Sequence, residues 1–290
     1  MKEKNIIIGI GELLWDMLPS GKKAGGAPVN FAFHASQTGA DGYAISALGE
    51  DPLGEELLQE LDNNGINYLI EKVNYPTGTV EVKLENGIPE YTIKENVAWD
   101  YIPLTETMKQ LATQADAICF GTLAQRNHVS RNTTEELLKL AEKCVYKLYD
   151  INLRQHFYSK ELIENSLTFA NAFKVNDEEI EILKDLFSLR MENEQVCRWF
   201  ISQYKLKLVI LTAGSAYSAV YTSDEDSTIE TPRVNVADTV GAGDCFSGVL
   251  IASLLNGKAL KESHRMAVDA AAHVCSFPGA WVKHTEVITE

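Results

Sequence analysis

The stretch Asp238-Thr239-Val240-Gly241-Ala242-Gly243-Asp244 is a turn of small residues that ends in a carboxylate and runs into an apolar segment. Apolar residues recur in that segment at Phe246, Val249, Leu250 and Leu254. This spacing predicts a helix that begins near Cys245 and stops at Gly257. The backbone N–H groups of residues 241–244 then lie at a helix N-terminus, where free amides and the helix dipole bind anions.

The chemistry of this turn points to phosphoryl transfer. A carboxylate beside an anion site is placed to take a proton from an alcohol while negative charge builds on the phosphoryl group. Asp244 is therefore the predicted general base, and the amides of Gly241, Ala242 and Gly243 hold the phosphoryl charge. The alternative is an ordinary glycine-rich turn with Asp244 as an exposed acid. The sequence has no G-x-x-x-x-G-K-[ST] loop, and its G-x-G stretches lack the third glycine of a dinucleotide fingerprint.

Composition bounds the class of protein. The chain has 290 residues, of which 45% are apolar and 23% charged, as in ordinary globular proteins. A formal net charge of −15 argues against nucleic-acid and anionic-membrane partners, which need a basic face. The run Ile6-Ile7-Ile8 is far too short for a signal peptide or a membrane span.

The cysteines and histidines indicate the cellular compartment and bear on metal binding. The five cysteines are widely spaced and include no C-x-x-C pair, which predicts reduced thiols in a cytoplasmic protein. The six histidines form no H-E-x-x-H or other paired metal pattern, so the sequence does not indicate a zinc enzyme.

Short apolar runs alternate with helical patterns along most of the chain, which predicts a parallel sheet covered by helices. The candidate core strands are residues 5–10, 43–48, 117–121, 147–151, 172–175, 206–212 and 218–221. One predicted helix opens at Asp51-Pro52 and ends at Gly65, and another starts after Gly26-Ala27-Pro28 and stops at Gly39.

Residues 66–97 break this alternation. Val80, Val82 and Leu84 alternate with polar residues, which predicts a sheet with one covered face, and Glu85-Asn86-Gly87 reads as a hairpin turn. We expect a small β appendage that closes over a pocket and excludes water. An ordinary β excursion packed on the core is the alternative.

Several separated motifs make the chain resemble the ribokinase-like, or PfkB, family of carbohydrate kinases. Residues 25–30, Gly-Gly-Ala-Pro-Val-Asn, look like its N-terminal Gly-Gly-x-x-x-Asn turn, and residues 47–54 follow at the family's distance. Residues 238–244 match its D-T-x-G-A-G-D motif, and residues 176–179 look like its N-x-x-E element. The resemblance implies one α/β domain over residues 1–290, a three-layer α/β/α sandwich with a mainly parallel central sheet. A small β-sheet lid is expected from about residues 12–24 and 66–98.

Within the family, residues 11–16, 76–80 and 150–154 look most like bacterial fructokinases. The resemblance implies transfer of the γ-phosphate of ATP to fructose, with Mg²⁺ as cofactor. Kinases for 2-keto-3-deoxygluconate, ribose or nucleosides share much of this pattern and remain alternatives, as does a non-catalytic sugar-binding regulator on the same fold. Lids of two subunits often pair in the family, which implies a homodimer through the lid.

The sugar site is expected at Asp16, Gly25, Gly26, Asn30 and Arg154. The Asp16 carboxylate follows the first strand and accepts two sugar hydroxyl groups at once. Gly25 and Gly26 let the backbone approach the sugar, and Asn30 both donates and accepts. Arg154 adds positive charge to the phosphates or binds the sugar. A solvated acid, a turn, a helix-start polar residue and a surface salt bridge are the alternatives.

The nucleotide side is expected at Asn176, Thr212, Gly214 and Gly279, together with the glycines of the anion turn. Thr212-Ala213-Gly214 looks like the family's T-x-G turn beside the ATP phosphates, and Gly279 belongs to a stretch that resembles its adenine pocket.

Glu179 and Asp238 are predicted to hold cations. Asn176 and Glu179 face one spot at i, i+3 near a helix start, and the family organises Mg²⁺ there through water. An ordinary capping pattern is the alternative. A monovalent cation, K⁺, near Asp238 follows from family analogy alone.

Overall fold

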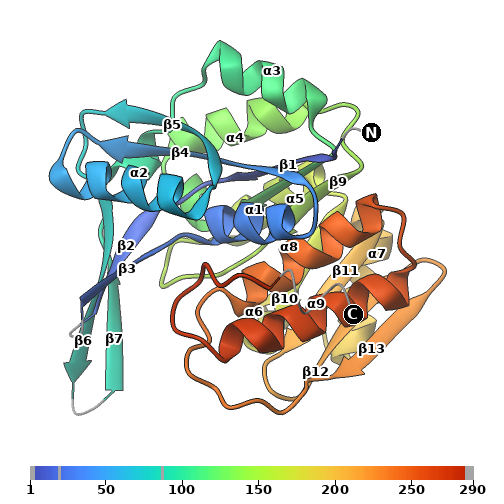
Figure 1. Ribbon diagram of the computed structural model, residues 1–290. Helices are drawn as coiled ribbons and strands as arrows, with labels where there is room; N and C mark the ends of the chain where they lie inside the picture. The colour runs from blue at the N-terminus through green and yellow to red at the C-terminus, as the bar shows by residue number, and fades with distance from the viewer. Residues whose placement is uncertain (1–3, 19–20, 86–87, 285–290) are drawn as a thin grey trace.

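The structure is a computed structural model that describes residues 4–18, 21–85 and 88–284, with the side chains of 82–91 excepted. Its central sheet has nine strands in the order β13-β12-β11-β10-β9-β8-β1-β4-β5 (Figure 1). Pairing is parallel from β5 across to β11 and antiparallel from β11 to β13. The strands are β1 (Ile6–Ile10), β4 (Asp41–Gly49), β5 (Asn67–Val73), β8 (Ala117–Gly121), β9 (Tyr146–Asp150), β10 (Ala172–Asn176), β11 (Leu208–Ala213), β12 (Tyr217–Thr222) and β13 (Asp226–Glu230).

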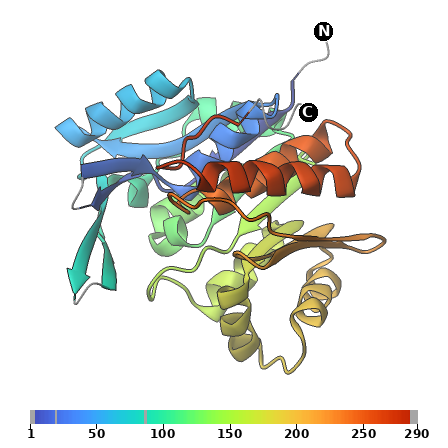
Figure 2. The ribbon, with the colours of Figure 1, turned by 60° about the horizontal axis from the view of Figure 1, so that its bottom comes forward.

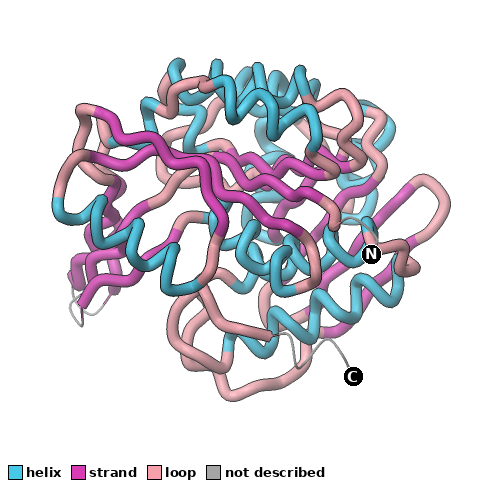
Figure 3. The backbone as a smooth tube through the Cα atoms, turned by 45° about the horizontal axis from the view of Figure 1, so that its top comes forward, coloured by secondary structure: helices cyan, strands magenta, loops and turns pink. Residues whose placement is uncertain are grey.

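Helices cover both faces of this sheet, so the fold is the expected three-layer α/β/α sandwich (Figure 3). Side chains alternate along each strand: Ile8 and Ile10 of β1 belong to one apolar cluster, and Ile7 belongs to the other. The first cluster is covered by α3 (Glu106–Gln114), α4 (His128–Leu140), α5 (Lys160–Phe169), α6 (Asp177–Phe187) and α7 (Asn193–Tyr204). The second is covered by α1 (Ala27–Gln37), α8 (Ala242–Leu255) and α9 (Leu260–Cys275).

Helix ends follow the local signals in the sequence. Helix α2 (Pro52–Asn64) begins at an Asp51 cap whose carboxylate accepts the Gly54 amide at 2.8 Å. It ends at Gly65, which takes a left-handed conformation with φ of 65°. The predicted strands and these helices are therefore confirmed.

Helix α8 begins at Ala242, three residues before the predicted start, and it is buried on every side from Cys245 to Ser253 rather than on one face. The reason is its place between α1, α9 and the sheet. Gly248 allows the close approach, since a Cβ there would lie 2.7 Å from the backbone oxygen of Phe31 in α1. A helix in such a place is apolar all round.

The lid is a separate four-stranded sheet in the order β3-β2-β6-β7, and it extends from one end of the molecule (Figure 2). Its strands are β2 (Leu14–Leu18), β3 (Gly21–Gly25), β6 (Gly78–Glu85) and β7 (Ile88–Ile93). Outside the lid sheet, the chain forms short 3₁₀ helices at Ala98–Tyr101 and Leu123–Arg126. Asn86 and Gly87 of the predicted hairpin turn lie outside the described residues.

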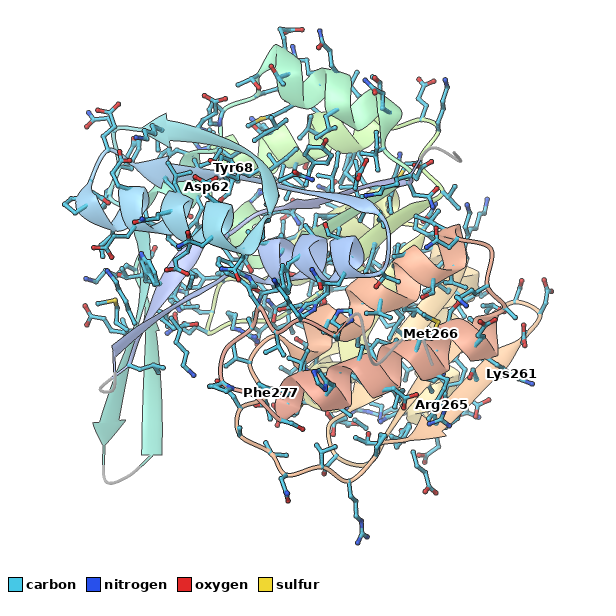
Figure 4. All side chains as sticks on the ribbon, in the orientation of Figure 1. Asp62, Tyr68, Lys261, Arg265, Met266 and Phe277 are labelled. Atoms are coloured by element: carbon cyan, nitrogen blue, oxygen red, sulfur yellow. The ribbon has the colours of Figure 1, made fainter. Side chains whose placement is uncertain are left out.

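The predicted lid boundary at residue 66 is wrong, because β5 belongs to the main sheet. It pairs in parallel with β4 from Tyr43↔Asn67 to Gly49↔Val73. The preceding helix α2 returns the chain to the sheet edge in a β-α-β unit, and Tyr68 of β5 donates a 3.1 Å hydrogen bond to Asp62 of α2 (Figure 4). The second lid segment therefore starts at Gly78.

All five cysteines are free. Four of them, Cys119, Cys144, Cys197 and Cys245, are buried, and Cys275 is half-buried. No helix within the described ranges combines the length and apolarity that crossing a bilayer requires.

Candidate active site

The predicted site residues gather where parallel strands reach their carboxyl ends. Asp150 closes β9, Asn176 closes β10, and Thr212 of β11 lies in register beside Asn176. Ligands of open α/β sheets bind at this edge. The loop after β1 adds acidic residues from the lid side, and the N-terminus of α8 faces them through Asp244.

Asp244 and Asn30 are 214 positions apart in the sequence, and the fold brings them into contact. The Asn30 Nδ2 donates to the Asp244 carboxylate at 2.8 Å, and the Asn30 Oδ1 accepts from Trp281 Nε1 at 2.8 Å. An indole N–H only donates, so the Asn30 amide has one orientation, with its NH₂ toward Asp244. Burial and nearby Asp150 raise the pKa of Asp244 to about 6, while Lys174, Asn30 and Arg154 oppose the rise.

The turn before α8 has the shape of an anion site, with one correction. The amide of Ala242 donates to the Thr239 carbonyl at 3.3 Å and is therefore engaged. In the part of the chain that the structure describes, the amides of Gly243 and Asp244 have no protein acceptor. Of the amides predicted for the anion site, that of Ala242 is therefore the one that the turn itself uses.

Gly241 holds this turn in place. Its φ is 78°, and a Cβ on it would lie 2.7 Å from the Cβ and 2.9 Å from the Cα of Ala280. We predict that Gly241→Ala displaces the turn and lowers kcat by about 10²-fold, the effect of roughly a 1 Å misplacement.

The matched control is Gly257→Ala at the end of α8. Gly257 has a similar φ of 84°, but its Cβ would meet nothing within 4 Å. Both variants accept about 1–2 kcal/mol of left-handed backbone strain, whereas only Gly241→Ala meets Ala280. Steady-state kinetics on the two proteins checks the prediction, and equal activity would contradict it.

A buried ion pair that the sequence analysis missed lies beneath the anion turn. Lys174 in β10 donates to Asp150 at 2.8 Å, and the two side chains are only 9% and 7% exposed. The Lys174 Nζ is 3.3 Å from the position that a Cβ on Gly243 would take. Burial alone would lower the pKa of Lys174, but Asp150, Asp244 and Glu179 raise it, so the ammonium stays charged. The available signal was a lysine within the apolar strand Ala-Phe-Lys-Val-Asn.

The lid contributes Asp16, whose carboxylate lies against the end of β3. A Cβ on Gly25 would come to 3.4 Å from Asp16 Oδ2, so the glycine leaves space beside the acid. Burial raises the pKa of Asp16, and Arg154 lowers it. Arg154 also lowers the pKa of Asp244, so its guanidinium acts on the acids of both site halves.

Glu12 is a second residue that sequence reasoning missed. It is 3% exposed, and its Oε2 has no hydrogen-bond partner in the described structure. Burial raises the pKa of Glu12 to about 7, and Asp244 and Asp150 add to the rise. Its backbone is held by Gly26, where a Cβ would lie 2.1 Å from the Glu12 carbonyl oxygen. Gly26 is therefore required by this close approach.

Asn176 and Glu179 form the capping box that was the alternative interpretation. Asn176 Oδ1 accepts the amides of Glu178 and Glu179, and the Glu179 carboxylate accepts the amides of Asn176 and Leu153 at 2.9 Å each. Burial raises the pKa of Glu179, and Lys174 lowers it.

The oxygen donors here still fit a water-bound Mg²⁺. Asp150 Oδ1 is buried without a hydrogen-bond partner, and Glu179 lies close enough to influence the same Lys174. Carboxylate oxygens are the ligands that Mg²⁺ prefers. Asp150, which the sequence analysis did not select, therefore offers a freer oxygen than Glu179.

Asp238 does not fit the predicted monovalent cation. Its carboxylate accepts from the Lys23 ammonium at 2.8 Å and from the amides of Val240 and Gly279 at 3.1 Å. Burial raises the pKa of Asp238, but these donors together lower it by more, so the net shift is downward. The lid lysine thus supplies the positive charge at this carboxylate.

The remaining residues predicted for the nucleotide side are Thr212, Gly214 and Gly279. Gly214, at φ of 48°, follows β11, and its carbonyl accepts from Thr231. Gly279 lies beside Asp238 through its amide. Thr212 and Gly279 are half-buried and Gly214 is exposed.

Comparison with known proteins gives a consistent picture. A family model described as pfkB family carbohydrate kinase matches residues 20–284. The chain is 27% identical over 282 residues to a fructokinase of Rhizobium leguminosarum bv. trifolii, covering 92% of this chain and 85% of that protein. It is 25% identical over 305 residues to an ATP-dependent 6-phosphofructokinase of Thermoanaerobacterium thermosaccharolyticum, covering 99% and 93%.

A solved structure shares the fold. The crystal structure of fructokinase with bound ATP from Xylella fastidiosa superposes with a TM-score of 0.84 at 19% identity, covering 99% of this chain and 97% of that one. Proteins named for different sugar substrates therefore match the chain along most of its length.

Proposed function

Because this chain belongs to the pfkB family of carbohydrate kinases, we propose that it transfers the γ-phosphoryl group of ATP to a hydroxyl of fructose. The observation that carries the proposal is the pairing of Asp244 with Asn30 beside the free amides of Gly243 and Asp244. A base and an anion site in contact are what an alcohol acceptor and a migrating phosphoryl group require.

Asp244 acts as the general base. The sugar hydroxyl gives its proton to the Asp244 carboxylate as its oxygen attacks the γ-phosphorus, and the O–P bond to ADP breaks. Asn30 is a positioning residue, since its NH₂ holds the carboxylate and its carbonyl is held by Trp281.

The phosphate side is held by this chain's own donors. The amides of Gly243 and Asp244 bind the transferred phosphoryl oxygens, and Lys174 adds a buried positive charge below Gly243. Arg154, which is exposed at the same edge, neutralises phosphates from the solvent side. When bound through water near Asp150 and Glu179, Mg²⁺ supplies charge neutralisation to the ATP phosphates.

The sugar side is lined by acids, which favours a neutral polyol. Asp238 raises the pKa of Asp16, and Asp244 raises the pKa of Glu12, so acids lie near one another on this side and disfavour a carboxylate or phosphate on the substrate. Three described lid lysines are each ion-paired: Lys22 with Glu56, Lys23 with Asp238 and Lys94 with Glu81. A relative named fructokinase at 27% identity supports fructose among neutral sugars.

A coupled ADP-release assay tests the function. The panel contains fructose, ribose, 2-keto-3-deoxygluconate, adenosine and fructose 6-phosphate, each with ATP and with or without Mg²⁺. We expect turnover with fructose and Mg²⁺. Preference for a charged substrate would overturn the fructose assignment, and sugar binding without ADP release across the panel would favour a non-catalytic regulator.

Acidic pH is predicted to inhibit the enzyme through Asp244. With a pKa of about 6, the carboxylate is ionised above pH 6 and protonated below it. We expect kcat/KM for the sugar to fall about tenfold per pH unit below that value. A profile that stays flat down to pH 5 would contradict the role of Asp244.

The Asn30→Leu variant tests whether Asp244 causes the fall in kcat/KM at acidic pH, which we call the acidic limb of the profile. Asn30 lowers the pKa of Asp244 through its hydrogen bond, so its loss should move the limb to higher pH. Trp281→Phe is the matched control, because it removes only the bond to Asn30 Oδ1 and leaves the donor to Asp244. If Glu12 rather than Asp244 set the limb, the Asn30 variant would leave it unmoved.

The lid further supports assembly as a homodimer. Strands β3 and β7 form the two edges of the lid sheet, and a strand edge carries N–H and C=O groups that can pair with another copy. Light scattering on the purified chain should give twice its mass of 32.1 kDa. A monomeric mass at micromolar concentration would contradict this assignment.

The cysteines support a cytoplasmic location. All five are free, as in proteins of reducing compartments. Cell fractionation should recover the protein with cytoplasmic markers, and recovery from the cell exterior would contradict it.

A further inference from the structure

Two histidines and a cysteine from distant parts of the chain meet below the anion turn. His34 lies in α1, Cys245 in α8, and His284 in the segment after α9. One nitrogen of each ring and the Cys245 sulfur all lie within 4.8 Å of one another. The side chains are 0%, 0% and 1% exposed, respectively.

The ring nitrogens of this cluster lack the partners that buried polar atoms normally have. His34 Nε2 is 2.9 Å from the Ala280 carbonyl, which only accepts, so Nε2 carries the proton and Nδ1 carries a lone pair. That Nδ1 and both nitrogens of His284 are buried with no hydrogen-bond partner. Each such group costs about 1–3 kcal/mol unless a ligand satisfies it.

Another buried histidine of this protein, His264, has a hydrogen-bond partner for each ring nitrogen. His264 is also 0% exposed, but its two nitrogens are each 2.8 Å from a serine hydroxyl, Ser218 and Ser227. The unpartnered nitrogens are therefore a property of the His34–His284 pair and not of buried histidines in this fold.

The two imidazole rings lie close together and stack. The centroids of His34 and His284 are 5.0 Å apart, with 21° between the ring planes. Because an imidazole lone pair lies in the ring plane, one ring has to turn out of this stack for both to bind one ion at about 2.0–2.1 Å.

We propose that His34 Nδ1, Cys245 Sγ and one nitrogen of His284 bind a Zn²⁺ ion. Imidazole nitrogens and thiolates are both ligands that zinc binds in proteins, and a site with three protein ligands leaves a fourth position for water. On binding, the Cys245 thiol releases its proton to solvent, and the ligand atoms close to about 3.5 Å from one another. The Ala280 carbonyl orients His34, as second-shell acceptors do at zinc sites.

The ion would tie together the segments that hold the catalytic pair. Cys245 follows Asp244 directly, His34 lies one turn after Asn30 in α1, and His284 lies three residues after Trp281, which contacts Asn30. We expect bound zinc to stabilise the Asn30–Asp244 contact. This effect on activity rests on the proposed kinase function, whereas metal binding itself does not.

The test is Co²⁺ binding to the full-length chain under reducing conditions, with Zn²⁺ as competitor. Wild type should bind one equivalent of Co²⁺ with the absorption of a thiolate-bound tetrahedral ion, and Zn²⁺ should displace it. Cys245→Ser and His284→Ala should each weaken binding by more than about 100-fold, beyond the loss caused by second-shell changes. Cys197→Ser and His264→Gln, buried residues of the same types outside the cluster, should bind as wild type does.

Circular dichroism reports whether each variant is folded, and crystals of the wild type grown with Zn²⁺ keep the test independent of the variants. An anomalous zinc peak between the three side chains is expected. Absence of that peak, or Co²⁺ binding that survives Cys245→Ser, would overturn the proposal. Neither result depends on whether fructose is the substrate.

Discussion

Replacing Asp244 by asparagine is expected to lower kcat by about 10²–10⁴-fold, the usual contribution of a general base. Asparagine has the same shape, and its carbonyl can still accept from the Asn30 NH₂ that now holds the carboxylate at 2.8 Å. The affinity for sugar and ATP should change little, because proton transfer belongs to the transition state.

Single-turnover kinetics with fructose and ATP measures this loss at the chemical step. Glu55→Gln is the matched control, since Glu55 is also an acid in the first turn of a helix but is exposed in α2. The control should retain wild-type turnover. An Asp244→Asn enzyme whose kcat stays within a few-fold of wild type would remove Asp244 from the mechanism.

Replacing Lys174 by methionine should damage both stability and catalysis. The change leaves Asp150 buried without its ammonium partner, and breaking such a pair costs about 3–5 kcal/mol. It also removes a positive charge beside Gly243, and loss of one electrostatic donor typically lowers kcat by about 10²–10³-fold.

The double variant Asp150→Asn/Lys174→Met separates the two effects. With the orphaned carboxylate gone, the free energy of unfolding measured in urea should recover much of the loss. The activity should not recover, since the cation is still absent and the Asp150 oxygen proposed to serve Mg²⁺ is changed as well, so the catalytic role of Lys174 is judged on the single variant. A Lys174→Met protein that is unstable but fully active would restrict Lys174 to a structural role.

The fold was largely predictable because its signals are local. Apolar runs and caps such as Asp51 and Gly65 lie within a few residues of the elements that they define. The error over β5 has the opposite origin: the segment reads as a strand in either sheet, and only its pairing with β4 assigns it. The buried state of α8 likewise depends on α1 and α9, which no local pattern reveals.

Site residues were predictable where they belong to a contiguous motif. They were not predictable where only the fold brings distant residues together. Asp244 and Asn30 were selected from separate contiguous motifs and meet in the structure, and Asp16 lies beside Gly25, which was selected with it. Glu12 and Lys174 were missed because their roles come from neighbours far along the chain. The sequence showed no metal motif, since the ligands of the proposed zinc site span residues 34 to 284 and meet only through folding.

A crystal structure of the protein with fructose and a non-hydrolysable ATP analogue tests the central claim most directly. We predict a fructose hydroxyl within hydrogen-bond distance of the Asp244 carboxylate, and the terminal phosphate on the amides of Gly243 and Asp244. A sugar bound away from Asp244, or a triphosphate that does not reach the start of α8, would contradict the account.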